Sequence, residues 1–435
     1  ILIMLVMVLY NMADTFFIGQ TGDPAKIAAL SLCAPLFSIL SGLGTLFGSG
    51  GCTFLSLAFG RKDTDKIKVC TSFCCYASLF LGFLFSALLL AFPDTICTAL
   101  GADTATLSYA SAYLRIIGLG APFLMFNNVF ANLIRADGSA VQSMAANLLG
   151  TVANILLDAL FILVFSWDVA GAALATVLGN LISDGYLLYY VTKKQKAFSL
   201  SPRLFTLKKE ISLSVLSLGV PLACSTILMS ISNVVANRMM ASYGSTALAA
   251  QGVAGKIGML ISMLAMGICM GMQPALSYNF GRGNVSRMNH LIRSLAVFNV
   301  VLGSILAVLG FLFRDALISF FIENETVLSY SRIMLLASLA TGPFYGLYQL
   351  CQTFLQSPGK ASYATFAALL DKGLCYLPIL FVMRHFFGMY GIAFTPAVTL
   401  CFSLVAGAGL SFSWKRTISR EITKSGENSS IEAMI

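Results

Sequence analysis

Thr151-Val-Ala-Asn-Ile-Leu-Leu-Asp158 lies inside an apolar run that extends from Val141 to Trp167. As a helix the run is long enough to cross a bilayer, since about 20 residues suffice at about 1.5 Å each. A carboxylate at that depth costs at least about 2–3 kcal/mol. Asn154 precedes Asp158 by four residues and shares its helical face. The stretch therefore predicts a membrane-spanning fold and a functional site within it.

The composition also indicates a membrane protein. Of 435 residues, 58% are hydrophobic and only 10% are charged, whereas soluble domains carry about 25% charged residues. Apolar runs of about 20 residues or more exceed the strands of a membrane barrel, so we predict an all-α polytopic membrane protein. The net charge of +9 comes from short loops. That distribution suits a cytoplasmic membrane surface and excludes nucleic acid as the expected partner.

Hydropathy predicts twelve transmembrane helices. Their expected ranges are 1–20, 28–59, 69–92, 106–134, 140–166, 169–192, 211–242, 247–280, 291–313, 328–355, 361–383 and 388–413. Because the chain begins inside the first of them, we expect helix 1 to be truncated. Lys and Arg gather in the loops after the second, sixth and eighth spans and in the C-terminal tail. Such an excess marks the cytoplasmic side, so we expect a cell-membrane (inner or plasma membrane) protein with both termini in the cytoplasm.

The two halves of the chain resemble each other. Leu57-Ala-Phe-Gly-Arg61 recurs 221 residues later as Tyr278-Asn-Phe-Gly-Arg282. With six spans each, the halves form a parallel repeat, an arrangement in which transporters bind substrate between two moving lobes. We therefore predict two pseudo-symmetric six-helix lobes. The expected parts are an N-terminal lobe 1–193, a cytoplasmic linker 194–210, a C-terminal lobe 211–414 and a cytoplasmic tail 415–435.

Oxygen-bearing residues of the N-terminal half share one membrane layer. Counted from the span ends at about 1.5 Å per residue, Asp14, Asp158 and Thr176 lie about 9–12 Å below the outer surface, and Asn154 lies about 6 Å deeper. Two carboxylates at low dielectric need a shared proton or a bound cation. We predict that Asp14, Asn154, Asp158 and Thr176 form a cation-coupling site for H⁺ or Na⁺. The alternative is that each acid only makes a hydrogen bond between helices.

Three further residues, Asn11, Asp371 and Lys256, are secondary candidates for the site. Asn11 lies one turn before Asp14 and is either a ligand or a helix-packing residue. In the second half, Asp371 with Lys256 or Lys372 forms either a buried ion pair or part of a substrate site. That half lacks the acid, amide and hydroxyl set of the first, so we place coupling in the first half only.

Several motifs resemble the MATE (multidrug and toxic compound extrusion) family over nearly the whole chain. They are Tyr10-Asn-Met-Ala-Asp-Thr-Phe-Phe-Ile-Gly19, Gly171-Ala-Ala-Leu-Ala-Thr176, Asn154 with Asp158, and the doubled Phe-Gly-Arg. The details resemble the bacterial branch that includes the staphylococcal multidrug pump. The resemblance implies a V-shaped pair of lobes that exports cationic amphipathic drugs against Na⁺ or H⁺. Asp14, Asn154, Asp158 and Thr176 match the N-lobe cation site of the family. Among C-lobe acids that some relatives use, Asp371 is the one open candidate.

The resulting functional prediction is a multidrug antiporter that needs no cofactor beyond its coupling ion and acts as a monomer in membrane lipid. One alternative is a flippase for lipid-linked precursors, which a cluster of intramembrane Arg would favour. Another is a non-transporting receptor or a channel, whose flux would not depend on an opposing gradient. An enzyme is not expected, because the sequence has no HExxH or GxSxG segment.

Overall fold

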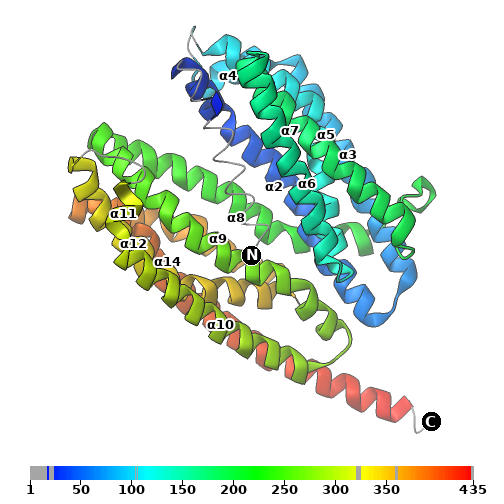
Figure 1. The fold of residues 1–435 in the computed structure, drawn as a ribbon. Helices are drawn as coiled ribbons and strands as arrows, with labels where there is room; N and C mark the ends of the chain where they lie inside the picture. Colours follow the sequence, from blue (N-terminus) through cyan, green and yellow to red (C-terminus); the bar gives the residue numbers. More distant parts are fainter. Residues whose placement is uncertain are drawn as a thin grey trace. The chain divides into compact units, whose positions relative to one another are not determined.

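The computed structural model describes residues 17–18, 24–102, 104, 106–319, 325–357 and 361–432, and within these ranges it is helical without a strand (Figure 1). Helices satisfy every backbone polar group within one segment, which is what a bilayer interior requires. The first predicted span, 1–20, falls outside the described residues except at 17–18. The chain divides into two compact units, Ile1–Ser230 and Ile231–Ile435.

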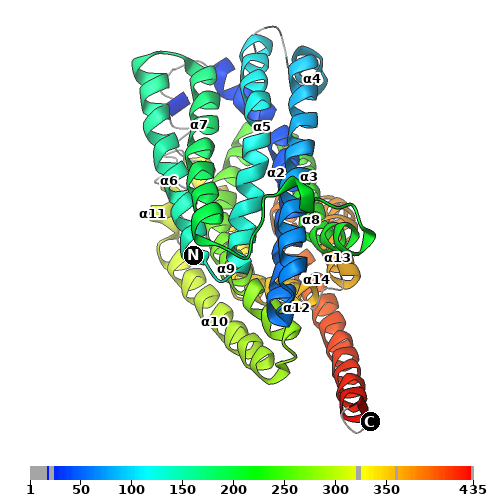
Figure 2. The same cartoon turned by 90° about the vertical axis from the view of Figure 1, so that its right-hand side faces the viewer.

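The first unit is built around α5. Its elements are α2 (Pro24–Arg61), α3 (Thr64–Ala91), α4 (Pro93–Leu100), α5 (Leu107–Ala136), α6 (Ala140–Asp158), the π-helix η1 (Ala159–Val164), α7 (Asp168–Tyr189), the π-helix η2 (Tyr190–Lys194), the 3₁₀-helix η3 (Pro202–Leu204) and most of α8 (Lys209–Ala241). Helix α5 lies between α7 on one side and α2 and α3 on the other (Figures 1 and 2). The most apolar window of α5 is 72% buried, against 33% for α3, so α5 forms the centre of this unit.

The second unit repeats this plan around α12. It contains α9 (Ser245–Gly281), α10 (Val285–Leu312), α11 (Arg314–Ser319), α12 (Glu325–Gln356), α13 (Ala361–Leu369), the π-helix η4 (Leu370–Leu374) and α14 (Tyr376–Glu432). Helix α12 packs against α9, α10 and α14. Since α5 and α12 correspond to the fourth predicted span of each half, the internal repeat in the sequence is matched by the packing.

The described helices agree with the predicted spans. Among the described residues, ten stretches are long and apolar enough to cross a membrane. One of them, residues 362–412, covers the last two predicted spans, 361–383 and 388–413. Helix α14 is interrupted between those spans at Gly388, whose φ of 59° and ψ of −135° are not helical. Only glycine adopts such backbone angles readily, so the predicted boundary between the two spans is a real break.

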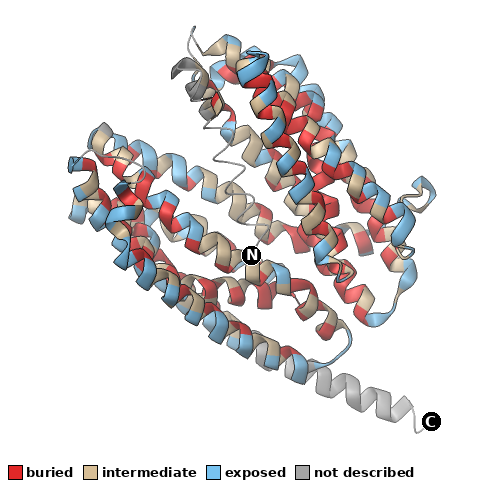
Figure 3. Ribbon diagram, in the orientation of Figure 1, coloured by how far each residue is buried: buried red, intermediate tan, exposed pale blue. Residues whose placement is uncertain are grey.

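Buried residues gather where helices of one unit meet, and exposed residues line the outer faces (Figure 3). Many of the exposed residues are large and apolar, including Phe80, Phe83, Phe311 and Val405, each at least 48% exposed. A soluble protein rarely leaves so much apolar surface uncovered. These faces suit contact with lipid chains.

Candidate functional site

Three of the four predicted cation-site residues, Asn154, Asp158 and Thr176, lie on α6 and α7, which form an antiparallel pair. The chain reverses just after η1, where Ser166 and Asp168 adopt left-handed φ angles of 54° and 49°. The rings of Phe161 and Trp167 stack at the turn with centroids 5.1 Å apart. Asp158 lies eight residues before Ser166, and Thr176 lies eight residues after Asp168. Equal distances from the turn bring the two side chains to the same level.

Two glycines let the pair approach closely at this level. A Cβ on Gly179 would lie 2.8 Å from the carbonyl oxygen of Gly150 and 2.9 Å from Cβ of Asn154. A Cβ on Gly150 would in turn lie 2.9 Å from the carbonyl oxygen of Gly179. Small residues at such crossings are the usual way that membrane helices pack backbone to backbone. Asn154, one turn beyond Gly150, is thereby held against α7.

The structure brings Asn154, Asp158 and Thr176 together. All three are buried, with exposed fractions of 1%, 0% and 2%. When the Asn154 amide points its nitrogen at α6, Nδ2 donates to Oδ2 of Asp158 over 3.2 Å and the amide oxygen accepts from the backbone N–H of Thr176 over 3.2 Å. In the opposite orientation Nδ2 is 3.5 Å from Oγ1 of Thr176. Only the first orientation pairs donors with acceptors on both sides, so we take it as the working geometry.

This group combines one carboxylate with an amide and a hydroxyl. Such oxygens can hold a proton or complete the shell of a small hard cation. The π-helix η1 begins directly after Asp158, and π-segments occur often at functional sites because they re-aim side chains. Among the described residues no group of three or more His, Cys, Asp or Glu could hold a metal ion. Asp14, the fourth predicted member, and Asn11, a secondary candidate, lie outside the described residues.

In the second unit Asp371 pairs with its neighbour in sequence. The Asp371 Oδ2 and Lys372 Nζ atoms are 2.7 Å apart, and the carboxylate side chain is only 5% exposed. Both residues belong to η4, and the Lys372 carbonyl accepts a 2.7 Å hydrogen bond from Oγ of Ser232. Lys256 is an exposed residue of α9. Of the two ion pairs considered from the sequence, the one present is Asp371 with Lys372.

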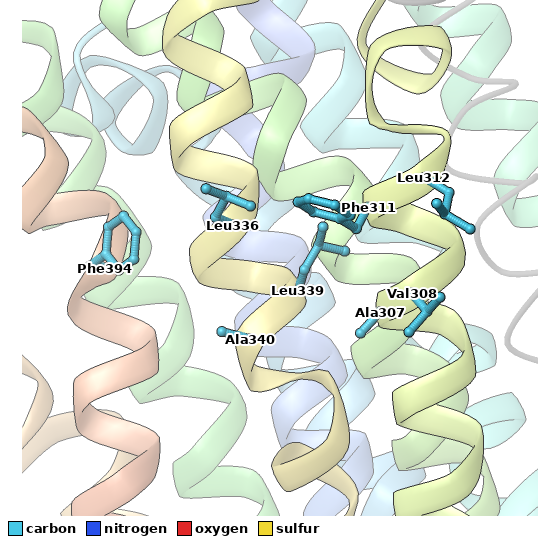
Figure 4. A pocket seen from close by; sticks show the side chains of 8 residues that line it. All are labelled: Ala307, Val308, Phe311, Leu312, Leu336, Leu339, Ala340 and Phe394. Carbon is cyan, nitrogen blue, oxygen red and sulfur yellow. The ribbon is translucent and has the colours of Figure 1, made fainter.

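A hollow of about 500 Å³ on the second unit is wholly apolar (Figure 4). It is lined by side chains of α10, α12 and α14, among them Phe311, Leu336 and Phe394. Its rim residue Leu312 is 67% exposed. With no polar lining it offers nothing to a cation and is better suited to a lipid chain.

A second acid of the first unit was not predicted as a site residue. Asp184 on α7 is 7% exposed, and its Oδ1 accepts a 3.0 Å hydrogen bond from Nδ2 of Asn127 on α5. The signal available in the sequence was an acid deep in the span 169–192, a rare event that usually has a function.

Comparison with known families identifies related sequences over most of the chain. The model of the family described as MatE matches residues 1–160 and 221–382. The multidrug export protein MepA of Staphylococcus saprophyticus is 32% identical over 399 residues, which cover 91% of this chain and 88% of that protein. MepA of Staphylococcus aureus strain N315 is 31% identical with the same coverage.

Solved structures share the fold. A crystal structure of a MATE in the bent conformation superimposes with a TM-score of 0.88 at 21% identity, covering 97% of this chain and 94% of the other. An outward-facing multidrug resistance MATE family transporter of the MOP superfamily gives a TM-score of 0.89 at 22% identity with the same coverage. The predicted all-α architecture of two six-helix lobes is therefore confirmed at the level of the fold.

Proposed function

The chain belongs to the MatE family of multi-pass membrane transporters, and from this premise we propose that it exports small-molecule drugs by antiport against H⁺ or Na⁺. The relatives that cover 91% of the chain are named multidrug export proteins. The observation that carries the coupling proposal is the buried contact of Asn154 with both Asp158 and Thr176. Within an apolar unit, one carboxylate with neutral polar neighbours is suited to exchange a monovalent cation.

In the proposed cycle the charge on Asp158 selects between two states of the carrier. With H⁺ or Na⁺ bound, the carboxylate is neutralised and drug is released. Once the ion leaves, the ionised carboxylate favours the state that takes up drug, because each ligand shifts the population only by its differential affinity. Asp14 is the second predicted carboxylate of this site. A cationic amphipathic drug fits the scheme, since it replaces the positive charge that has left.

The membrane orientation is part of the proposal. Lys193 and Lys194 end the π-helix η2 after α7, and basic loops favour the cytoplasmic side. Both termini then face the cytoplasm, and the Asp158 site opens toward the outer half of the membrane. We also propose that the protein acts as a monomer in the lipid bilayer.

The test is dye efflux from vesicles that contain the purified protein, under an imposed pH gradient and then under an imposed Na⁺ gradient. Efflux driven by one gradient identifies the coupling ion. Asp158→Asn should reduce that efflux at least tenfold, while Asp65→Asn, at an exposed position of α3, should leave it unchanged. Full efflux by Asp158→Asn with normal protein levels would refute the coupling role.

A further inference from the structure

Asp184 and Asn127 form a buried polar cluster that the proposed Asp158 mechanism does not use. Among the described residues, the carboxylate accepts one hydrogen bond, from Asn127 to Oδ1, while Oδ2 is buried without a hydrogen-bond partner. Both side chains are 7% exposed. A buried carboxylate oxygen with no donor costs about 1–3 kcal/mol or more when charged. Such a cost is retained in membrane helices mainly where the group has a function.

The surroundings of the cluster are apolar. One helical turn along α5 from Asn127 lie Phe130 and Ala131, and one turn along α7 from Asp184 lies Leu187, all members of one hydrophobic core. On the α6 side, Gly150 packs against Ser183 with room for no Cβ. An ionised Asp184 therefore faces low dielectric with one neutral donor, and the protonated form removes that cost.

Charged groups on the elements that pack against α7 do not compensate Asp184. Near the start of α7, Arg115 pairs with Asp94 and Lys26 with Asp168. Toward its end, Arg135 donates to Asn132. The remaining titratable groups of these elements are Cys33, Cys52, Arg61, Tyr109, Tyr113, Asp158, Tyr186, Tyr189, Tyr190, Lys193 and Lys194. Among the described residues, none of the cations forms a salt bridge with Asp184.

Asp184 lies between the level of the Asp158 site and the other end of α7. Asp184 lies eight residues beyond Thr176, or about 12 Å along the axis. Asn180 stands between them and donates from Nδ2 to the carbonyl oxygen of Thr176 over 2.8 Å. Spacings of four residues keep all three on one side of the helix. Asp184 therefore lies in the opposite half of the unit from Asp158.

We propose that Asp184 is a second proton-binding carboxyl of the first unit, loaded at Oδ2 and placed between the Asp158 site and the η2 end of α7. The role of Asp184 in transport rests on the proposed function, whereas the binding of a proton by Asp184 does not. The step is a reversible proton transfer: the carboxylate oxygen accepts H⁺ from hydronium and leaves water, and no other bond changes. Sodium is not expected here, because Asn127 presents an N–H rather than an oxygen and a hard cation needs several oxygen ligands.

Infrared spectroscopy of the purified full chain in lipid nanodiscs tests the site without transport. The wild type should show the band of a protonated carboxylic acid at neutral pH. Asp184→Asn keeps the side-chain shape and should remove the Asp184 part of that band, while Asp65→Asn should leave the band unchanged. Asn127→Leu removes the donor that stabilises the charged form, so the band should persist to higher pH. This second variant also covers the case in which Asp184→Asn does not fold.

Three results would overturn the proposal. They are a band of unchanged intensity in folded Asp184→Asn, a titration unaffected by Asn127→Leu, and removal of the Asp184 part of the band by Na⁺ at constant pH. In vesicles, Asp184→Asn should cut pH-driven dye efflux at least tenfold and flatten its pH dependence. If the wild type shows no pH-driven efflux, H⁺ coupling fails, and the infrared titration still decides whether Asp184 binds a proton.

Discussion

Replacing Gly179 by alanine tests whether the close approach of α6 and α7 sets the Asp158 site. The added Cβ would lie 2.8 Å from the carbonyl oxygen of Gly150 and 2.9 Å from Cβ of Asn154. Ordinary contact begins near 3.4 Å, so the helices must separate by roughly half an ångström. A backbone oxygen cannot rotate away, and such overpacking costs about 1–3 kcal/mol.

The separation acts directly on the hydrogen bond between Asn154 and Thr176, because that bond crosses from α6 to α7. Its length of 3.2 Å is already at the long end of the range for N–H···O bonds, about 3.2 Å. Lengthening it by half an ångström breaks it and frees the Asn154 amide, which also donates to Asp158 on its own helix. A neutral hydrogen bond contributes about 0.5–1.5 kcal/mol, which corresponds to roughly 2–10-fold in an equilibrium constant.

Gly185→Ala is the matched control on the same helix. Gly185 is exposed, and a Cβ there would meet nothing within 4 Å. Both variants gain the helix propensity of alanine, up to about 1 kcal/mol, so their difference isolates the clash. We expect Gly179→Ala to unfold at a lower temperature than Gly185→Ala and to shift the coupling-ion concentration for half-maximal dye efflux by roughly 2–10-fold. Equal unfolding temperatures and equal ion dependence would refute the reasoning.

Three other predictions concern other parts of the chain. Lys372→Met should destabilise the protein by about 3–5 kcal/mol, because it leaves the Asp371 charge buried without its partner. In the double variant Asp371→Leu/Lys372→Met the unfolding temperature should rise back toward that of the wild type, and an unfolding temperature that stays low would argue against a simple ion pair. Gly219→Ala should lower the amount of folded protein in the membrane, since a Cβ there overlaps a backbone carbonyl of α2, whereas Gly252→Ala, with open space around it, should accumulate normally. Burial raises the pKa of Asp137 in the loop before α6, so Asp137 stabilises the fold below its unfolded pKa of about 4, and this stabilisation is lost as pH rises through the higher folded pKa. The unfolding temperature of the wild type relative to Asp137→Asn should therefore fall over that pH range. A constant difference between the two unfolding temperatures would contradict the buried environment.

Hydropathy alone predicted the helices of this protein, because the cost of placing polar groups in lipid is local to each segment of the chain. It located ten described spans and the break near Gly388, and it identified Asn154, Asp158 and Thr176 as deep polar residues. Counting residues from a turn then placed Asp158 and Thr176 at one level. The sequence could not show that Asn154 contacts both, since that depends on the Gly150–Gly179 crossing, where two backbones from different helices meet.

Only the tertiary structure decided the partners of the remaining buried charges. Asp371 pairs with Lys372 rather than with Lys256, and Asp184 finds its donor on Asn127, 57 residues away. Such choices depend on which faces two helices turn toward each other, and many rotations of an almost uniformly apolar helix look alike in sequence. Packing removes that ambiguity, because only one rotation lets small residues meet and buried polar atoms find partners.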